Sequence, residues 1–143
     1  MSGGKAPVQP FAIELRVYYE DTDAAGVVYY ANYLRFMERA RNEWLRAQLG
    51  GPHELALKAG VLFAVRSLAI KFQAPARLDD VLRVTADPVS IRGASLTFRQ
   101  ECWRAMQCVC VGEVGVACVD ARTFAPHRLP SELLQVLAEA SAP

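Results

Sequence analysis

The clearest pattern of apolar and polar positions in this chain lies between Asn32 and Leu49. Apolar side chains recur there at spacings of three and four residues, as they do along one face of an α-helix. That face consists of Tyr33, Leu34, Met37, Ala40, Arg41, Trp44, Leu45 and Leu49, with Arg41 as its single charged member. Two glycines and Pro52 follow, which is typical of a helix C-terminus. The pattern predicts one long helix over residues 32–49 and a short helix over residues 52–59.

Charged residues on the other side of the long helix stand at spacings that allow ion pairs. The predicted pairs are Arg39/Glu43, four residues apart, and Arg35/Glu38, Glu38/Arg41 and Glu43/Arg46, each three residues apart. This face is therefore expected to meet solvent.

Five further segments alternate between apolar and polar residues or are strongly apolar throughout, as β-strands are. They cover residues 11–20, 61–73, 81–91, 94–105 and 108–123. Residues 74–80, Arg92-Gly93 and Met106-Gln107 read as the turns between them. Gly112 and Gly115 predict a bulge or bend within the last strand. A short terminal helix is expected over residues 131–140, with Ser131 as its N-cap.

The order of these elements is one strand, one long helix and then four strands joined by short turns. Such an order predicts an α+β fold, because alternating βαβ units are absent. A single antiparallel sheet packed against the long helix would bury the helix's apolar face. The opposite face of the sheet also carries apolar residues, so we expect it to meet another subunit. The whole chain, residues 1–143, is predicted to form one domain.

Composition and charge exclude several classes of function. Hydrophobic residues make up 52% of the chain and the net charge is +1, which predicts a packed core and gives no support to a nucleic-acid partner. No apolar run is long enough to cross a bilayer. Residues 1–7 are small and polar and do not resemble a signal peptide. We therefore expect a soluble cytoplasmic protein.

The four cysteines do not form a recognisable metal or redox motif. Cys108 and Cys110 are separated by one residue, and neither His53 nor His127 lies near them in the sequence. The alternating pattern instead predicts that Cys102, Cys108, Cys110 and Cys118 are small buried or half-buried hydrophobic residues.

The richest chemistry lies in the run DTDAAGVVYY at residues 21–30. It places two carboxylates and a glycine directly before the long helix, where backbone N–H groups lack partners. A carboxylate there could attack a substrate or activate water, and the amides could hold an oxyanion. The alternative interpretation is that Asp21 and Asp23 only cap a turn or the helix.

Three separated motifs resemble the hotdog-fold acyl-CoA thioesterases. They are RVYYEDTDAAGVVY at residues 16–29 followed by Tyr33 and ERAR at residues 38–41, FQAPARLDD at residues 72–80, and RGASL at residues 92–96. The strongest similarity is to the branch associated with the Tol–Pal system, related to 4-hydroxybenzoyl-CoA thioesterase. The resemblance covers about residues 12–130.

This resemblance implies a five-stranded antiparallel sheet wrapped around a central helix. It implies dimers that join two sheets edge to edge, dimers that pair into tetramers, and active sites between subunits. It also implies hydrolysis of acyl-CoA without a metal or cofactor, with acyl carrier protein as a further candidate partner. The second acid of the D-x-D-x-x-G motif is the family's catalytic residue, which here is Asp23.

The position of Tyr30 departs from the pattern of the Tol–Pal branch, which commonly has histidine there. The family uses the backbone N–H at this position to polarise the thioester carbonyl, and the substitution leaves that group in place. We therefore assign the carbonyl-polarising role to the Tyr30 backbone, with Asp23 as nucleophile or general base.

Further residues are candidates for contacting the substrate. Gly26 allows the loop to approach a ligand closely, and Tyr29, Tyr33 and Phe36 either wall an acyl pocket or belong to the core. Candidates for contacts with the CoA phosphates or pantetheine arm are Arg66, Ser67, Arg92, Gly93 and Ser95. Each of these could equally be an ordinary surface or turn residue.

Other functional interpretations remain. Glu38 lies on the helix that carries the acid in related hotdog enzymes, but nearby arginines favour an ion-pair role for it. An acyl-thioester dehydratase would need a histidine with a helix carboxylate, whereas both histidines lie outside the motif. The other alternative is a module that binds acyl thioesters or acyl carrier protein without turnover.

Overall fold

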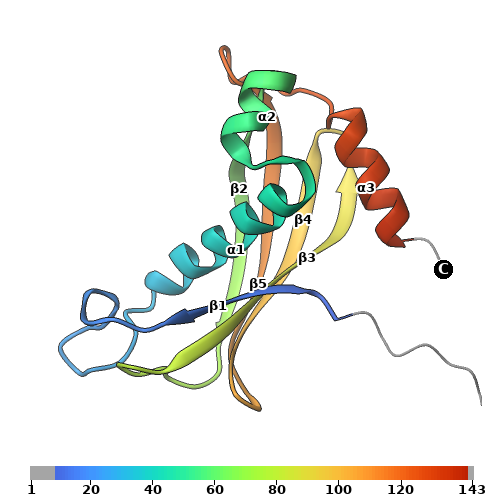
Figure 1. Cartoon of the computed structure of the whole chain (residues 1–143). Helices are drawn as coiled ribbons and strands as arrows, with labels where there is room; N and C mark the ends of the chain where they lie inside the picture. The colour runs from blue at the N-terminus through green and yellow to red at the C-terminus, as the bar shows by residue number, and fades with distance from the viewer. Residues whose placement is uncertain (1–8, 142–143) are drawn as a thin grey trace, which may run out of the picture.

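A computed structural model describes residues 9–141 and shows one antiparallel sheet that curves around a central helix (Figure 1). The five strands lie in the order β1-β3-β4-β5-β2. Their bounds are β1 Phe11–Arg16, β2 Val61–Phe72, β3 Val81–Arg92, β4 Ser95–Arg104 and β5 Gln107–Asp120. The helices are α1 Asn32–Leu49, α2 Pro52–Ala59 and α3 Ser131–Ser141, with a 3-10 turn, η1, at Tyr19–Asp21. The predicted α+β hotdog fold is confirmed.

The first and last strands are shorter than the sequence predicts. After β1, the chain leaves the sheet because the Asp21 carboxylate accepts a hydrogen bond from the backbone N–H of Tyr18 (2.8 Å), which closes η1. After β5, the Asp120 carboxylate accepts hydrogen bonds from the N–H groups of Arg122 and Thr123 (2.9 Å each) and forms a turn. Alternation continues past both points, so periodicity alone could not locate these ends.

The terminal helix begins at Ser131, as predicted, and ends one residue later than predicted, at Ser141. Ser131 is the first residue of α3, so Pro130 precedes the helix, and its carbonyl accepts a hydrogen bond from the Leu134 N–H at 3.0 Å. The predicted N-cap role of Ser131 is therefore wrong. Both α1 and α2 have the predicted bounds, and Gly50 ends α1 with a positive φ of 86°.

The bulge predicted at the glycines of β5 lies elsewhere. The register shifts in β2 between Val65 and Ser67, opposite Gly115, and again where β4 and β5 pair near Trp103. The β5 glycines instead permit close approach. A Cβ on Gly115 would lie 2.2 Å from Oγ of Ser67, and one on Gly112 would lie 3.1 Å from Sδ of Met37.

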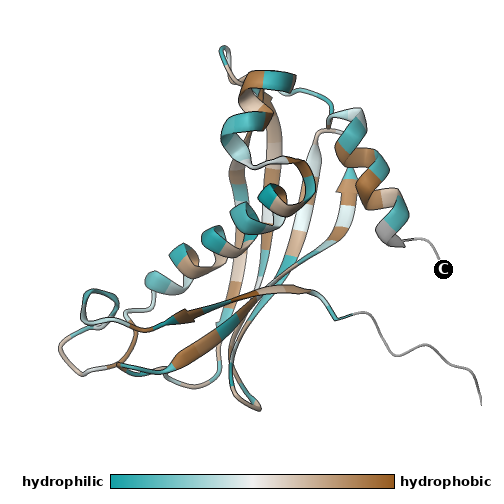
Figure 2. Cartoon of the chain, viewed as in Figure 1, coloured by the Kyte–Doolittle hydropathy of each residue, from teal (hydrophilic) through white to brown (hydrophobic). Residues whose placement is uncertain are grey.

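The apolar face of α1 forms the core together with the inner face of the sheet. Phe36, Met37 and Ala40 are fully buried, and the Trp44 ring lies 5.4 Å from that of Phe98 on β4. Figure 2 shows hydrophobic residues at intervals along α1 and along the strands behind it. Burying each such large side chain stabilises the fold by about 1.5–3 kcal/mol.

The cysteines belong to this packing, as predicted. Cys102, Cys110 and Cys118 are buried, Cys108 is half-buried, and all four are free thiols. Burial raises the pKa of Cys118 to about 11. Among the described residues, no group of three histidine, cysteine or acidic side chains is arranged to hold a metal ion.

The outer face of the sheet is more charged than predicted, and exposed apolar residues lie on β3 and at the β2 edge. On the outer face Arg99 pairs with Glu101 at 3.3 Å, and the Arg83 guanidinium lies 5.9 Å from the centre of the Trp103 ring. At the β2 edge, Val65, Leu68 and Phe72 are about half exposed, at 51%, 46% and 52%. Within residues 9–141, no helix combines the length and apolarity that a membrane span requires.

Candidate active site

Asp21 anchors the loop between β1 and α1 and is not free for chemistry. Its side chain is buried, with Oδ2 accepting from the Tyr18 N–H and Oδ1 accepting from the Asn32 side chain at 2.9 Å. Its backbone carbonyl accepts from the Tyr29 N–H at 2.9 Å. These three bonds tie the end of β1 to the start of α1, so Asp21 fixes the position of everything between them.

Asp23 lies exposed on the loop that Asp21 fixes. Its backbone N–H donates to the Val27 carbonyl at 2.9 Å, and its own carbonyl accepts from Gly26, whose φ is +78°. The side-chain oxygen Oδ1 accepts from the Ala25 N–H at 2.8 Å. Within the described part of the chain, no donor reaches the other oxygen, Oδ2. The carboxylate is therefore held at one oxygen and open to a reactant at the other.

The backbone N–H of Tyr30 is available at the entrance to α1. The neighbouring N–H groups of Tyr29 and Asn32 donate to Asp21 and Tyr29 respectively, at 2.9 and 2.8 Å. No acceptor among residues 9–141 takes the Tyr30 N–H. Figure 1 shows this loop at the N-terminal end of α1, where the helix dipole favours negative charge. The geometry suits the stabilisation of an oxyanion.

Aromatic rings connect this loop with the end of β2. The Tyr30 ring lies 6.2 Å from that of Phe72, and the Tyr33 ring lies 5.7 Å from the same phenylalanine. Tyr33 and Phe36 are buried, which assigns both to the core, whereas Tyr29 and Tyr30 are exposed. Burial raises the pKa of Tyr33, and a hydrogen bond with the Tyr30 side chain raises the pKa of Tyr29.

The predicted CoA-contacting residues gather in a second place. Arg66, at the β2 bulge, donates to Oγ of Ser95 at 2.9 Å, and Ser95 pairs with Arg92 across the Gly93 turn. Ser67 follows Arg66 on β2. Phe72 adjoins the Asp23 loop through the ring of Tyr30. At the usual rise per residue of a strand, the Cα atoms of Phe72 and Ser67 are roughly 17 Å apart. Within one chain, these residues are not brought to Asp23.

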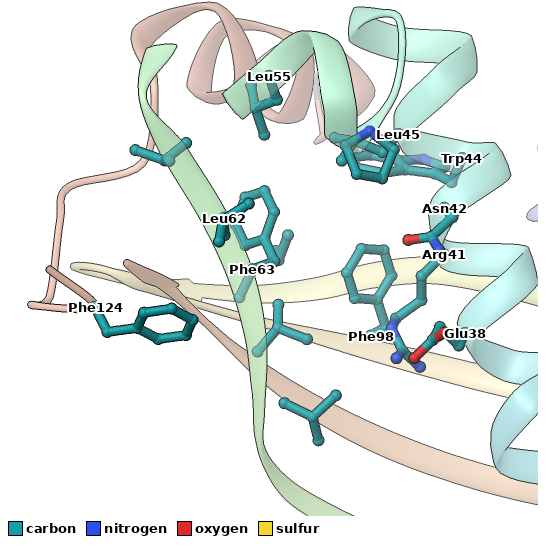
Figure 3. A pocket seen from close by; sticks show the side chains of 15 residues that line it. Glu38, Arg41, Asn42, Trp44, Leu45, Leu55, Leu62, Phe63, Phe98 and Phe124 are labelled. Carbon is teal, nitrogen blue, oxygen red and sulfur yellow. The ribbon is translucent and has the colours of Figure 1, made fainter. Parts of the chain in front are cut away.

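A cavity of about 330 Å³ lies between α1 and the first half of β2 (Figure 3). Its walls are mainly apolar, with Glu38, Arg41 and Asn42 of α1 as polar members. The pattern of the sequence does not predict this cavity. The available signal was Arg41, a charged residue on the apolar face of a helix.

The ion pairs predicted along α1 are mostly not formed. Arg46 pairs with Glu43, but none of the other predicted pairs lies within 4.0 Å in the described part of the chain. Arg41 instead donates to the Gln100 side chain on β4 at 3.0 Å. Tertiary packing offers Arg41 a buried acceptor that the helix alone cannot supply, which leaves Glu38 without the predicted ion pair.

Comparison with known proteins bears directly on this arrangement. A model of the thioesterase-like superfamily matches residues 17–137. This span includes the Asp23 loop and the group formed by Arg66 and Ser95. The chain belongs to the thioesterase-like superfamily.

Named members of this superfamily match nearly the whole chain. The acyl-CoA thioesterase YbgC of Haemophilus influenzae is 42% identical over 123 residues, which cover 86% of this chain and 90% of that protein. The acyl-CoA thioester hydrolase YbgC of Escherichia coli is 43% identical over 125 residues, with 87% and 92% covered. A probable thioesterase from Bartonella henselae has a TM-score of 0.80 at 32% identity, covering 85% of this chain and 100% of that one.

These matches confirm the predicted family and the predicted class of enzyme, a hotdog thioesterase. The association with the Tol–Pal system stays a prediction. The roles of individual residues in this superfamily member rest on the geometry described above.

Proposed function

We propose that this chain hydrolyses acyl-CoA thioesters to a free acid and CoA, with Asp23 and the backbone N–H of Tyr30 as the reacting groups. The observation that carries the proposal is their common loop. One carboxylate oxygen of Asp23 and the Tyr30 N–H are both without partners in the described residues, at the N-terminal end of α1. Relatives 42% and 43% identical to this chain are named for the same reaction.

The two groups divide the chemistry between them. Hydrolysis breaks the bond between the carbonyl carbon and sulfur, and it develops negative charge on the carbonyl oxygen. The Tyr30 N–H stabilises that charge. Asp23 either attacks the carbonyl to form an anhydride that water then cleaves, or removes a proton from the attacking water. In both routes the thiolate of CoA leaves and takes up a proton.

The CoA portion is proposed to bind at the group of residues around Arg66 and Ser95. Arg66 and Arg92 supply positive charge for phosphate groups, and Ser67 and Ser95 supply hydroxyls for the phosphates or the pantetheine arm. Gly93 keeps the turn between β3 and β4 tight, with a φ of 62°. Gly26 and Tyr29 are proposed to contact the substrate beside Asp23. Acyl carrier protein stays a candidate donor of the acyl group.

A dimer formed along β2 would bring the Asp23 loop of one copy toward the Arg66 and Ser95 group of the other. β2 is an edge strand whose exposed side chains include the apolar Val65, Leu68 and Phe72 beside Arg66 and Lys71. Such an edge is costly to leave unpaired. Antiparallel pairing of two β2 strands sets the Phe72 end of one copy beside the Val61–Val65 half of the other. The Asp23 loop of one copy then lies beside the Val61–Val65 half of the second, which Arg66 follows directly. Further pairing into a tetramer stays a prediction.

The decisive experiment follows thiol release from a panel of acyl-CoA esters with the purified protein and its Asp23→Asn variant. We expect turnover by the wild-type protein and a fall in kcat of at least about 100-fold in Asp23→Asn, because the amide keeps the shape but cannot attack or accept a proton. Glu20→Gln changes an exposed carboxylate of the same loop and should retain full activity. Tight binding of acyl-CoA without thiol release would favour the binding-module alternative.

A further inference from the structure

The cavity beside α1 is apolar except along one wall. Its apolar lining comes from α1, α2 and strands β2, β4 and β5 and includes Trp44, Leu45, Leu55, Phe63 and Phe98. Figure 3 shows Arg41 and Glu38 projecting from α1 on the side of the cavity near Phe98. A volume of about 330 Å³ lies at the lower end of the range of small-molecule pockets.

Arg41 is held in this wall by a buried hydrogen-bond network. Its Nη1 donates to Oε1 of Gln100 at 3.0 Å. Gln100 is fully buried, and its Nε2 donates to the carbonyls of Met37 and Thr85 at 2.9 and 3.0 Å. Because both donors of the Gln100 amide are used, its oxygen must face Arg41. The guanidinium is therefore anchored to the sheet through Nη1.

The remaining N–H groups of Arg41 find no acceptor among the residues that the structure describes. Burial lowers the pKa of Arg41 while the negative charge of Glu38 opposes that shift, and a guanidinium stays charged in proteins. Half-buried donors without partners are costly. The cavity thus offers fixed hydrogen-bond donors at the edge of an apolar space.

The cavity also lies at the right place for an acyl group. It borders the Val61–Val65 half of β2, whereas the Asp23 loop meets the Phe72 end. In the dimer proposed above, the loop of a second copy adjoins this cavity. The inference that follows rests on that proposed function.

We infer that the cavity takes the end of the acyl group remote from the thioester and that Arg41 selects acyl groups carrying a neutral hydrogen-bond acceptor there, a hydroxyl or keto oxygen. Glu38 disfavours a carboxylate at the same place by like-charge repulsion. A volume of about 330 Å³, at the lower end of the range of small-molecule pockets, suits the end of a medium chain or a single aromatic ring.

The test compares kcat/KM for matched acyl-CoA pairs: butanoyl, hexanoyl and octanoyl esters, each with and without a hydroxyl on the last carbon. At the length that reaches Arg41, the wild-type protein should prefer the hydroxylated member by about tenfold or more, as expected for a hydrogen bond to a charged group. Arg41→Met should abolish that preference. Arg39→Met removes a cation from the exposed face of the same helix and should keep it.

The outcomes separate this inference from the proposed function. If the wild-type protein releases thiol neither from these esters nor from the acyl-CoA panel above, the proposed function fails and the inference fails with it. If it hydrolyses them without a preference, or if Arg41→Met keeps the preference, the inference alone is overturned. A stronger preference for adipoyl-CoA, which ends in a carboxylate, would also overturn it. Should Arg41→Met not fold, Arg41→Lys retains the charge without the planar fork and should show a reduced preference.

Discussion

At the scale of single residues, the two aspartates of the D-x-D motif have opposite surroundings. Asp21 is buried and accepts two hydrogen bonds through its carboxylate, from Tyr18 and Asn32. Asp23 is exposed, with only Oδ1 engaged, by the Ala25 N–H. The two aspartate side chains therefore have different roles. Asp21 stabilises the loop, and the loop holds Asp23 exposed to solvent.

The structural role of Asp21 can be tested by removal of its side chain. Asp21→Ala should lower the free energy of unfolding by about 1.5–3 kcal/mol, because it leaves the buried side chain of Asn32 and the Tyr18 N–H without their acceptor. Chemical denaturation measures the change. Glu20→Ala, at an exposed neighbour, should have no effect, and equal stability of the two variants would contradict the assignment.

Substitutions at Tyr30 distinguish a role of its backbone N–H from a role of its side chain. Tyr30→Phe should keep most of kcat, because the N–H and the ring both remain. Tyr30→Pro should lower kcat by about 10²–10³-fold, since proline has no N–H to stabilise the oxyanion. Position 30 precedes the first residue of α1, and proline is tolerated at the start of a helix. Circular dichroism verifies that the Tyr30→Pro variant keeps its fold. Loss of turnover in a folded Tyr30→Phe would show instead that the hydroxyl takes part.

At the scale of elements, α1 and β4 are joined by more than apolar packing. Gln100, in the middle of β4, donates to a helix carbonyl, accepts from a helix arginine and donates to the neighbouring strand. Such a fully satisfied buried amide fixes the position of the helix over the sheet. It thereby fixes both the entrance to α1, where the Asp23 loop ends, and the polar wall of the cavity.

Removing this amide should loosen the helix–sheet contact. Gln100→Leu fills a similar volume but leaves the Thr85 carbonyl unpaired and Arg41 without its partner, at a cost of about 1–3 kcal/mol. Thermal denaturation with Gln48→Leu, an exposed position on α1, as the control measures the difference. Equal melting temperatures would show that the network does not stabilise the fold.

At the scale of the whole molecule, the site is divided between two regions that one chain keeps apart. The Asp23 loop lies at the Phe72 end of β2, and Arg66 with Ser95 lies toward the other end. In the proposed dimer, a second copy paired along the same strand unites them. The proposed function therefore predicts that assembly is required for activity and not only for stability.

The expected assembly is at least a homodimer in solution. Leu68→Asp places a charge at the apolar edge of β2 and should convert the protein to a monomer with little thioesterase activity. Light scattering and thiol release are measured on the same sample. Leu57→Asp, at a 70% exposed leucine of α2, should remain dimeric and active. A wild-type monomer at micromolar concentration, or an active Leu68→Asp monomer, would contradict a shared site.

The sequence by itself determined the elements and the reacting loop. A repeat of three and four residues produces an amphipathic helix wherever it occurs, and the α1 bounds follow from that repeat and from Gly50. The D-x-D-x-x-G motif and its neighbours likewise carry their family resemblance within one stretch of chain. These features are local, so local pattern suffices to find them.

Only the tertiary structure decided which residues meet across long separations. The bulge opposite Gly115 depends on how β2 pairs with β5, and neither strand encodes that register alone. Arg41 bonds to Gln100 instead of pairing with Glu38, because folding supplies an acceptor 59 positions away. Tyr33 and Phe36 belong to the core for the same reason: burial is set by what packs over a side chain, and the surface that covers them comes from distant strands.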